Sequence, residues 1–272
     1  MKRALVLGGG GARGVAHVGV IRALEEKGFV PDLIVGVSIG ALVGAAYSIL
    51  ADSSSLWEIT LRTHRKAARW LSLSKSRENT HSRIFSAIAC AYLNSFGAAL
   101  PSGIYFRTLR KHLGRYRFSD TKIPFMCTST IMNSAELCIH NEGSIYEALR
   151  ASMAIPGLFK PEKKGNLRLA DGGILNNLPV SVAREANSTF VVAVDLSSSN
   201  RVTSFNTSNS ILGMMDECKA DLILQREMAD ADIVISPVRT RNIDLMDFSS
   251  CIDFMNESYE ETLKCDLNGV IL

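Results

Sequence analysis

The chain has 272 residues, of which 47% are hydrophobic and 21% charged, and its formal net charge is +3. These values are typical of a globular protein that can bury a sizeable core, and the charge is too small to indicate a nucleic-acid partner. Six cysteines are widely spaced and form no C-x-x-C pair or Cys/His cluster, so neither a zinc site nor a disulfide framework is expected.

The chain begins with a predicted strand–loop–helix unit. Residues 4–7 are an apolar run of strand type, and they are too short for a signal peptide. Residues 8–14 are rich in glycine, and residues 15–27 carry apolar side chains near helical spacing, with Gly28 as the expected C-cap. Together with the reduced thiols that the cysteine spacing favours, this start predicts a cytoplasmic protein.

The glycine loop has two interpretations. Gly9-x-Gly11-x-x-Gly14 follows a strand and opens a helix, and Asp32 lies 18 residues beyond Gly14, as in a dinucleotide-binding site. The same glycine N–H groups, at a helix N-terminus, are also suited to hold the oxyanion of a tetrahedral intermediate. Asp32 follows Pro31 and is equally typical of a turn, so it does not decide between the two.

The next unit favours the second interpretation. A predicted strand over residues 32–37 runs into Gly36-x-Ser38-x-Gly40, and a small-residue helix follows. This is the nucleophile-elbow pattern, in which a sharp strand-to-helix turn presents the serine hydroxyl beside the helix N-terminus. A dinucleotide site has no need of such a serine, and the repeated β–α order predicts an α/β fold with a mostly parallel sheet.

Residues 62–100 have a different composition. No acid occurs between Glu58 and Glu78, whereas six basic residues do, and residues 84–100 carry no charge at all. One interpretation is a solvated basic face followed by a buried core helix. The other is a cap that meets an anionic membrane surface and screens an apolar acyl site. The basic residues are Arg62, Arg65, Lys66, Arg69, Lys75 and Arg77.

The rest of the chain continues the alternation of strands and helices. Ser144 is a predicted N-cap, with Glu147 at the capping-box spacing. Residues 197–210 are rich in Ser, Asn and Thr and predict a loop. Expected helices are 102–113, 144–153, one ending near 186, 211–229 and 254–264; expected strands are 123–130, 135–140, 167–170, 190–196 and 233–236. We see no repeat or linker, so we expect a single domain over residues 1–272. Residues 197–272 contain no motif that indicates a particular fold or function.

A nucleophilic serine requires a base, and the order of residues limits the choice. No histidine follows Asp171 or Asp195, so the Ser–Asp–His order of an α/β-hydrolase cannot be met. His17, one turn into the first predicted helix, could approach the glycine loop, but it is expected to be an ordinary residue of that helix. Asp171 ends a predicted strand and precedes two glycines, which makes it the best carboxylate base, although Asp-Gly-Gly is also a common turn. The weaker carboxylates are Asp195, Asp230 and Asp232, and the other histidines are His64, His81, His112 and His140.

Three blocks of residues carry a family resemblance. Residues 8–14 (GGGGARG), 36–40 (GVSIG) and 171–179 (DGGILNNLP) resemble, in order and spacing, the signature blocks of the patatin-like phospholipase family. Residues 151–159 resemble the segment that precedes the aspartate block in bacterial members. The resemblance spans residues 1–196, and the three blocks together are far more specific than any one of them.

The resemblance implies a three-layer α/β/α fold with a mostly parallel central sheet and a Ser–Asp dyad that needs neither metal nor nucleotide cofactor. It implies Ser38 as nucleophile and Asp171 as base. The implied oxyanion hole comprises Gly9, Gly10, Gly11 and, at the family's basic position, Arg13. Further residues that match the motifs are Gly14, Gly36, Gly40, Gly172, Gly173, Asn177 and Pro179.

The expected function is therefore hydrolysis of fatty-acyl esters of phospholipids or lysophospholipids. The expected partners are the lipid substrate and an anionic membrane, at whose inner face the protein would act, and no nucleic acid. Two alternatives stay open: a nucleotide-binding protein that uses the Gly9–Gly14 loop, and a non-catalytic regulatory member of the same fold.

Overall fold

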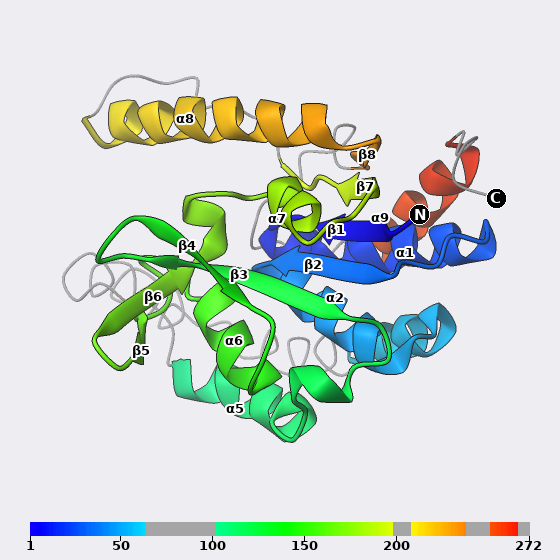
Figure 1. Ribbon diagram of the computed structural model, residues 1–272, viewed down its shortest axis with the longest axis horizontal. Coiled ribbons are helices and arrows are strands. Elements are labelled where there is room, and N and C mark those ends of the chain that lie inside the picture. The colour runs from blue at the N-terminus through cyan, green and yellow to red at the C-terminus, as the bar shows by residue number, and fades with distance from the viewer. Residues whose placement is uncertain (64–101, 198–207, 238–250, 266–272) are drawn as a thin grey trace, which may run out of the picture.

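A computed structural model describes residues 1–63, 102–197, 208–237 and 251–265, which form an α/β fold (Figure 1). The strands are β1 (Arg3–Leu7), β2 (Leu33–Val37), β3 (Phe125–Ile131), β4 (Glu136–His140), β5 (Glu162–Lys164), β6 (Leu167–Asp171), β7 (Phe190–Val194) and β8 (Ile233–Ile235). The helices whose bounds are described are α1 (Val15–Glu26), α2 (Ile39–Leu50), α5 (Ser102–Leu113), α6 (Ile145–Ser152), α7 (Val180–Glu185), α8 (Ser208–Asp230) and α9 (Cys251–Lys264), and residues 53–63 are helical as well.

The strands of the described ranges form one mixed sheet. Its centre is parallel, in the order β3-β2-β1-β7-β8, whereas β4, β5 and β6 join by antiparallel pairing. Parallel neighbours need crossover connections. Helix α1 follows β1 after the glycine loop, and α2 follows β2 at Ser38, as the alternating pattern of the sequence predicts. The prediction of a mostly parallel central sheet is confirmed.

Helices cover both faces of this sheet because successive strand residues point to opposite sides. In β1, Leu5 and Leu7 pack with α1, α2 and α9 in the larger core cluster. Ala4 and Val6 of the same strand point the other way, into a cluster with α7 and part of α8. The fold therefore has the three layers that were expected, with α7 and α8 on one side and the remaining helices on the other (Figure 1).

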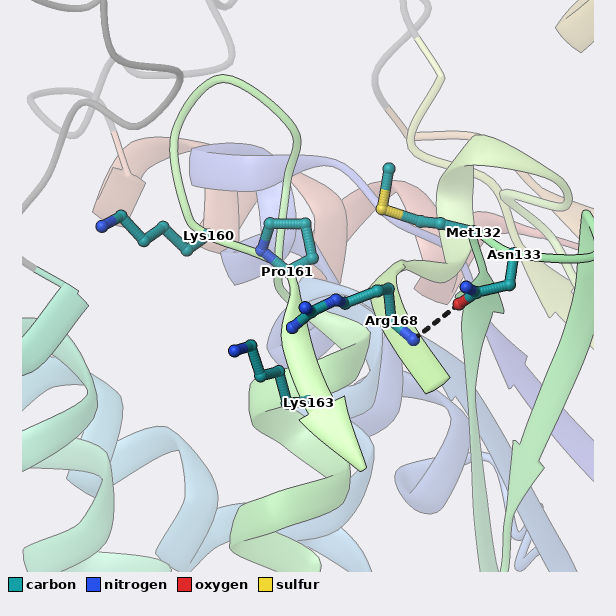
Figure 2. A pocket seen from close by; sticks show the side chains of 6 residues that line it. All are labelled: Met132, Asn133, Lys160, Pro161, Lys163 and Arg168. Atoms are coloured by element: carbon teal, nitrogen blue, oxygen red, sulfur yellow. Dashed lines mark hydrogen bonds between the residues drawn. The ribbon is translucent and has the colours of Figure 1, made fainter. Parts of the chain in front are cut away.

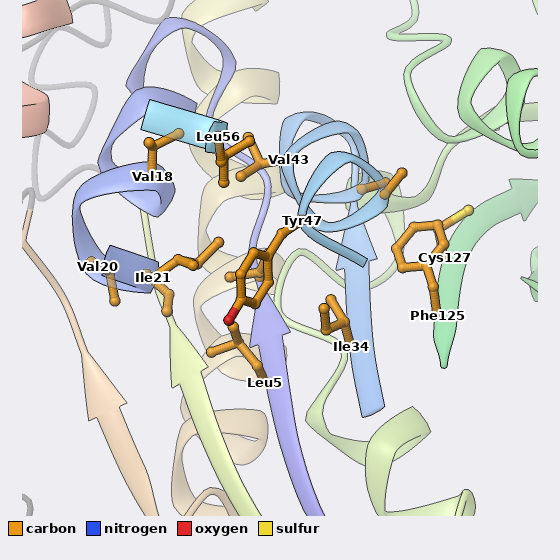
Figure 3. Close-up of a cluster of buried hydrophobic side chains, with 14 of the residues drawn as sticks. Leu5, Val18, Val20, Ile21, Ile34, Val43, Tyr47, Leu56, Phe125 and Cys127 are labelled. Carbon is orange, nitrogen blue, oxygen red and sulfur yellow. The ribbon is translucent and has the colours of Figure 1, made fainter. Parts of the chain in front are cut away.

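The larger cluster is centred on the space between β1, β2 and helices α1 and α2 (Figure 3). Tyr47 of α2 lies there among aliphatic side chains that include Leu5 and Ile34, and its hydroxyl donates a 2.7 Å hydrogen bond to Oε2 of Glu25. Burying a side chain of this size stabilises the fold by about 1.5–3 kcal/mol, and the hydrogen bond removes the cost of burying its hydroxyl. This packing fixes α2, and hence its N-terminus, against the sheet.

Most expected elements lie within a few residues of their predicted bounds, with two corrections. Strand β5 was not predicted, because Glu162-Lys163-Lys164 is polar and too short to show alternation; pairing with β6 makes it a strand. Helix α8 begins at Ser208, so the end of the loop expected over 197–210 is helical. Residues 198–207 of that loop, and residues 64–101 of the expected cap, lie outside the described ranges.

Candidate active site

The turn between β2 and α2 gives Ser38 an unusual backbone. Ser38 has φ 54° and ψ −123° and is the N-cap residue of α2, and the residue is only 6% exposed. A positive φ is costly for a residue with a side chain and is found where surrounding packing enforces it, often at functional sites. This is the backbone geometry expected of a nucleophile elbow.

The two glycines of the elbow allow close packing of the turn. A Cβ on Gly36 would lie 2.6 Å from Cα of Ala41, and a Cβ on Gly40 would overlap the carbonyl oxygen of Leu7. Neither obstacle is a flexible side-chain end, so neither could move aside cheaply. A larger residue at Gly36 would force β2 and α2 apart, and one at Gly40 would force α2 away from the end of β1.

Asp171 reaches Ser38 because β2 and β6 share one edge of β3. Strand β4 pairs with residues 127–131 of β3 on the other edge. On the shared edge, β2 pairs along residues 125–128, ending at Val37, and β6 pairs in the opposite direction along residues 129–131, ending at Asp171. The two strands thus run toward each other, and their ends place Ser38 and Asp171 side by side. Asp171 ends a strand, as the sequence predicts, and the antiparallel direction of β6 is what turns that end toward Ser38.

A short hydrogen bond joins the two side chains. The hydroxyl of Ser38 donates to Oδ2 of Asp171 at 2.6 Å, and the N–H of Gly173 donates to Oδ1 at 2.8 Å. The backbone of Asp171 is held as well, because Thr130 Oγ1 donates to its carbonyl at 2.9 Å and its N–H donates to the carbonyl of Ala154 at 3.0 Å. One carboxylate oxygen is therefore oriented by the backbone while the other faces the serine.

Burial sets the acidity of this carboxyl group. Asp171 is 5% exposed, and desolvation raises its pKa from 3.8 to about 6, against the opposing effects of the Ser38 and Gly173 hydrogen bonds. A carboxylate with a pKa near 6 is mostly ionised at pH 7 and is a stronger base than an exposed aspartate. The site therefore pairs a strained serine with a carboxylate that can accept its proton.

The glycine loop lies beside this pair. A Cβ built on Gly9 would lie 3.4 Å from Cβ of Ser38 and would overlap Oδ1 of Asn177. The N–H of Gly9 donates to the carbonyl of Asn177 at 3.1 Å, and Nδ2 of Asn177 donates to the carbonyl of Gly9 at 3.3 Å. Across the described part of the chain, the N–H groups of Gly10 and Gly11 have no such acceptor. The Asp171–Pro179 block thus holds the loop, and two loop N–H groups stay available.

Other residues of the motifs support this arrangement from further away. Arg13 is buried, and its Nε donates to the carbonyl of Gly10 at 3.2 Å. Gly14 lies against Ile39, where any Cβ would overlap the isoleucine side chain, and a Cβ on Gly172 would lie 2.7 Å from the carbonyl oxygen of Thr128. Pro179 is the N-cap residue of α7.

Two residues that bear on alternative functions have structural partners. Nε2 of His17 donates to the carbonyl of Gly8 at 2.7 Å, and burial lowers the pKa of this histidine to about 4. Asp32 precedes β2, at the opposite end of the sheet from the glycine loop, and accepts a 2.8 Å hydrogen bond from the N–H of Arg3. His17 therefore supports the loop, and Asp32 is not placed to bind a ribose held there.

The weaker carboxylate candidates are also engaged elsewhere. Asp195 accepts a 2.9 Å hydrogen bond from the N–H of Ser197, and Asp230 and Asp232 form ion pairs with Arg184. None of these contacts involves Ser38.

One contact of the elbow was not predicted. The N–H of Ser38 donates to Oγ of Ser152 at 2.9 Å, and Ser152 is the last residue of α6. Ser152 belongs to the 151–159 segment that resembles the family, but its sequence carries no signal for this role, since a serine near a helix end is common. It accepts from a buried N–H that has no acceptor within α2, because the N-cap residue precedes the first helical turn.

Within the described ranges, no three His, Cys, Asp or Glu side chains are grouped so that they could hold a metal ion. No helix described there is both long and apolar enough to cross a membrane.

A protein-family model and several curated proteins match this chain. The family model described as "Patatin-like phospholipase" matches residues 5–184, which include both Ser38 and Asp171. A mouse protein named "Patatin-like phospholipase domain-containing protein 6" is 30% identical over 266 residues, covering 94% of this chain and 18% of that protein. "Lysophospholipase NTE1" of Mycosarcoma maydis is 37% identical over 199 residues, covering 73% of this chain and 10% of that protein. This chain thus spans less than a fifth of these curated relatives.

Among solved structures, VipD from Legionella pneumophila has a similar fold. The TM-score is 0.52 at 16% sequence identity, and the match covers 97% of this chain and 66% of that one. The likeness extends beyond the segment that the family model matches and concerns the fold alone.

Proposed function

Since this chain belongs to the patatin-like phospholipase family, we propose that it is a serine esterase that releases fatty acids from phospholipids or lysophospholipids. The observation that carries the proposal is the 2.6 Å hydrogen bond from the strained Ser38 to the buried Asp171. Every residue of the proposed mechanism lies between Gly9 and Pro179, within one α/β fold. We therefore propose that residues 1–272 act as a single catalytic domain.

The reaction has two halves. Asp171 accepts the proton of Ser38 while Oγ attacks the ester carbonyl, and the tetrahedral intermediate collapses to an acyl-serine as the leaving alcohol takes the proton from Asp171. Water then attacks the acyl-serine with Asp171 again accepting a proton. The carbon–Oγ bond breaks, Ser38 regains its proton, and the fatty acid leaves.

The developing oxyanion requires donors that are already in place. The N–H of Gly9 donates to the carbonyl of Asn177, so the N–H groups of Gly10 and Gly11 are the loop donors that can bind the oxyanion. Ser38 also lies at the N-terminus of α2, where the helix dipole is positive. Arg13 acts on the loop by donating to the Gly10 carbonyl, which keeps that peptide's oxygen turned away from a developing negative charge.

The substrate class rests on family membership and on the printed names of the relatives, which include lysophospholipases and phospholipase-domain proteins. We further propose peripheral action at the inner face of an anionic membrane, with residues 62–100 as a cap. Most of those residues lie outside the described ranges, so this part rests on their basic and apolar composition.

The test is covalent labelling of the purified protein with a fluorophosphonate probe, followed by mass spectrometry of the modified peptide. We expect a single modified residue, Ser38, and release of fatty acid from lysophosphatidylcholine that stops when labelling is complete. No labelling of a folded protein would contradict the esterase and favour a non-catalytic role. Tight NAD(P) or ATP binding without labelling would favour a nucleotide-binding protein.

A further inference from the structure

An open surface hollow of about 410 Å³ lies at the outer corner of the sheet, where the β3–β4 turn meets β5 and β6 (Figure 2). The described residues that line it include three exposed cations and no acid: Lys160, Lys163 and Arg168. Their charged ends all point to the same side of the view, so the positive charge gathers on one side of the β5–β6 pair.

Two of these cations are direct neighbours. Lys163 of β5 pairs with Arg168 of β6 in the antiparallel register, which places both side chains on the same face of the pair. Like charges directly opposite each other destabilise a sheet. The acid of the same strand does not relieve them, because Glu162 points to the other face and accepts a 2.7 Å hydrogen bond from Arg150 of α6. In the ranges that the structure covers, neither Lys163 nor Arg168 forms an ion pair.

The backbone under this pair is fixed. The N–H of Met132 donates to the carbonyl of Arg168, and Oδ1 of Asn133 accepts from the N–H of Arg168, both at 2.8 Å. Lys163, Arg168 and Met132 are therefore neighbours in a line across β5, β6 and the end of β3. Met132 is 51% exposed. Two cations on a fixed backbone can contact anionic lipid headgroups, and the exposed apolar side chain beside them can contact the lipid below. This combination is typical of a membrane-binding surface.

The hollow is separate from the dyad. Arg168 lies three residues before Asp171 on β6, about 10 Å along the strand, and alternation places the two side chains on opposite faces. A group bound here would not reach Ser38, so the hollow is not part of the acyl site.

We propose that Lys160, Lys163 and Arg168 bind the phosphate of an anionic phospholipid headgroup and dock the protein on the membrane surface. Phosphate oxygens would neutralise the Lys163–Arg168 pair, and Met132 would meet the apolar boundary of the lipid. A nucleic acid also offers phosphates, but the exposed side chain here is aliphatic, whereas single strands are bound through aromatic stacking. The choice of lipid as the source of the phosphate rests on the proposed function.

The test measures binding of the full chain to vesicles of phosphatidylcholine with and without 30% phosphatidylglycerol. Because the Ser38→Ala protein is used, hydrolysis plays no part, and failure of the esterase proposal would leave this result intact. Each basic residue near an anionic surface contributes a factor of about five to partitioning, so Lys163→Gln/Arg168→Gln should bind anionic vesicles about 25-fold more weakly. A far-ultraviolet spectrum and melting temperature like those of the parent show that this variant folds.

A matched variant removes the same charge elsewhere. Lys219→Gln/Arg226→Gln on α8 changes two exposed cations and should lower anionic-vesicle binding less than threefold. Equal losses in the two variants would overturn the proposal, since net charge alone would then explain binding. So would equal binding to neutral and anionic vesicles, or binding of inorganic phosphate or single-stranded DNA that depends on Lys163 and Arg168 without any vesicle preference.

Discussion

Ser38 and Ser129 are buried serines that each form a hydrogen bond with a titratable side chain, and only Ser38 has the geometry of a nucleophile. Ser38 donates to Asp171 at 2.6 Å, and Ser129 shares a 2.8 Å hydrogen bond with Nε2 of His140. All four side chains are buried. The two pairs are also neighbours, because Ser129 and Asp171 are paired across β3 and β6.

The difference between the pairs lies in the backbone. Ser129 sits inside β3, with regular partners on both edges, so no free N–H groups converge near its hydroxyl. Ser38 has a positive φ, stands at the N-terminus of α2 and lies beside the glycine loop. A serine with a base next to it is therefore not sufficient for catalysis; the turn that surrounds it with N–H donors distinguishes Ser38.

The partners differ as well. Burial raises the pKa of Asp171 to about 6, but it lowers the pKa of His140 to about 4, with Lys164 adding to the effect. At neutral pH, Asp171 is a charged proton acceptor, and His140 is a neutral imidazole that completes a buried polar contact.

The sharpest test of this comparison is the removal of each hydroxyl. Ser38→Ala should lower hydrolysis of p-nitrophenyl butyrate by about 10⁴-fold or more, because the covalent path is lost. Ser129→Ala, measured in the same assay, should stay within about threefold of the parent. A folded Ser38→Ala protein with unchanged turnover would refute the nucleophile assignment.

Replacing each titratable partner is the next test. Asp171→Asn keeps the shape but cannot accept the proton, so activity should fall by about 10²–10⁴-fold, toward the Ser38→Ala background. His140→Gln keeps a polar partner for Ser129 and should retain most activity. His17→Ala removes a hydrogen bond to Gly8 but no proton acceptor of Ser38, so it should lower activity far less than Asp171→Asn. If a histidine variant that folds lost as much activity as Ser38→Ala, the site would be a triad.

The pH dependence distinguishes the pairs by their opposite pKa shifts. Only the ionised form of Asp171 accepts a proton, so kcat/KM should fall about tenfold per pH unit below about 6. Because burial holds the pKa values of His17 and His140 near 4, neither titrates in that region. The fall in kcat/KM below pH 6 should therefore be unchanged in His140→Gln. If this fall disappeared in that variant, the titrating group would be the histidine.

The Ser129–His140 pair should matter for stability instead. Ser129→Ala leaves Nε2 of His140 without its partner in a buried site, which costs about 1–3 kcal/mol of the free energy of unfolding. Urea denaturation followed by circular dichroism measures this loss. An unchanged unfolding midpoint would mean that water or another group replaces the hydroxyl.

Metal removal should have the smallest effect, because the mechanism uses no metal ligand. Exhaustive dialysis against EDTA should leave p-nitrophenyl butyrate turnover unchanged. Recovery of a lost activity by one specific cation would contradict this expectation.

The sequence by itself determined the local features. The glycine loop, the elbow at Ser38 and the Asp171 block each occupy a few consecutive residues whose types follow from a turn or a close approach, and periodicity located the elements around them. Ser38 and Asp171 were both named on that basis, with the dyad implied by the family resemblance.

Only the tertiary structure decided how these pieces meet. The approach of β2 and β6 along one edge of β3 depends on strand direction, and nothing within the residues of β6 indicates that it runs antiparallel. The sequence also contained no indication of the contacts between Asn177 and Gly9 or of the hydrogen bond from Ser38 to Ser152. Nor did it indicate that Lys163 and Arg168 are neighbours across two strands. Side-chain periodicity reports which face of an element is buried, but the choice of partner strand, its direction and its register are set by packing between distant parts of the chain.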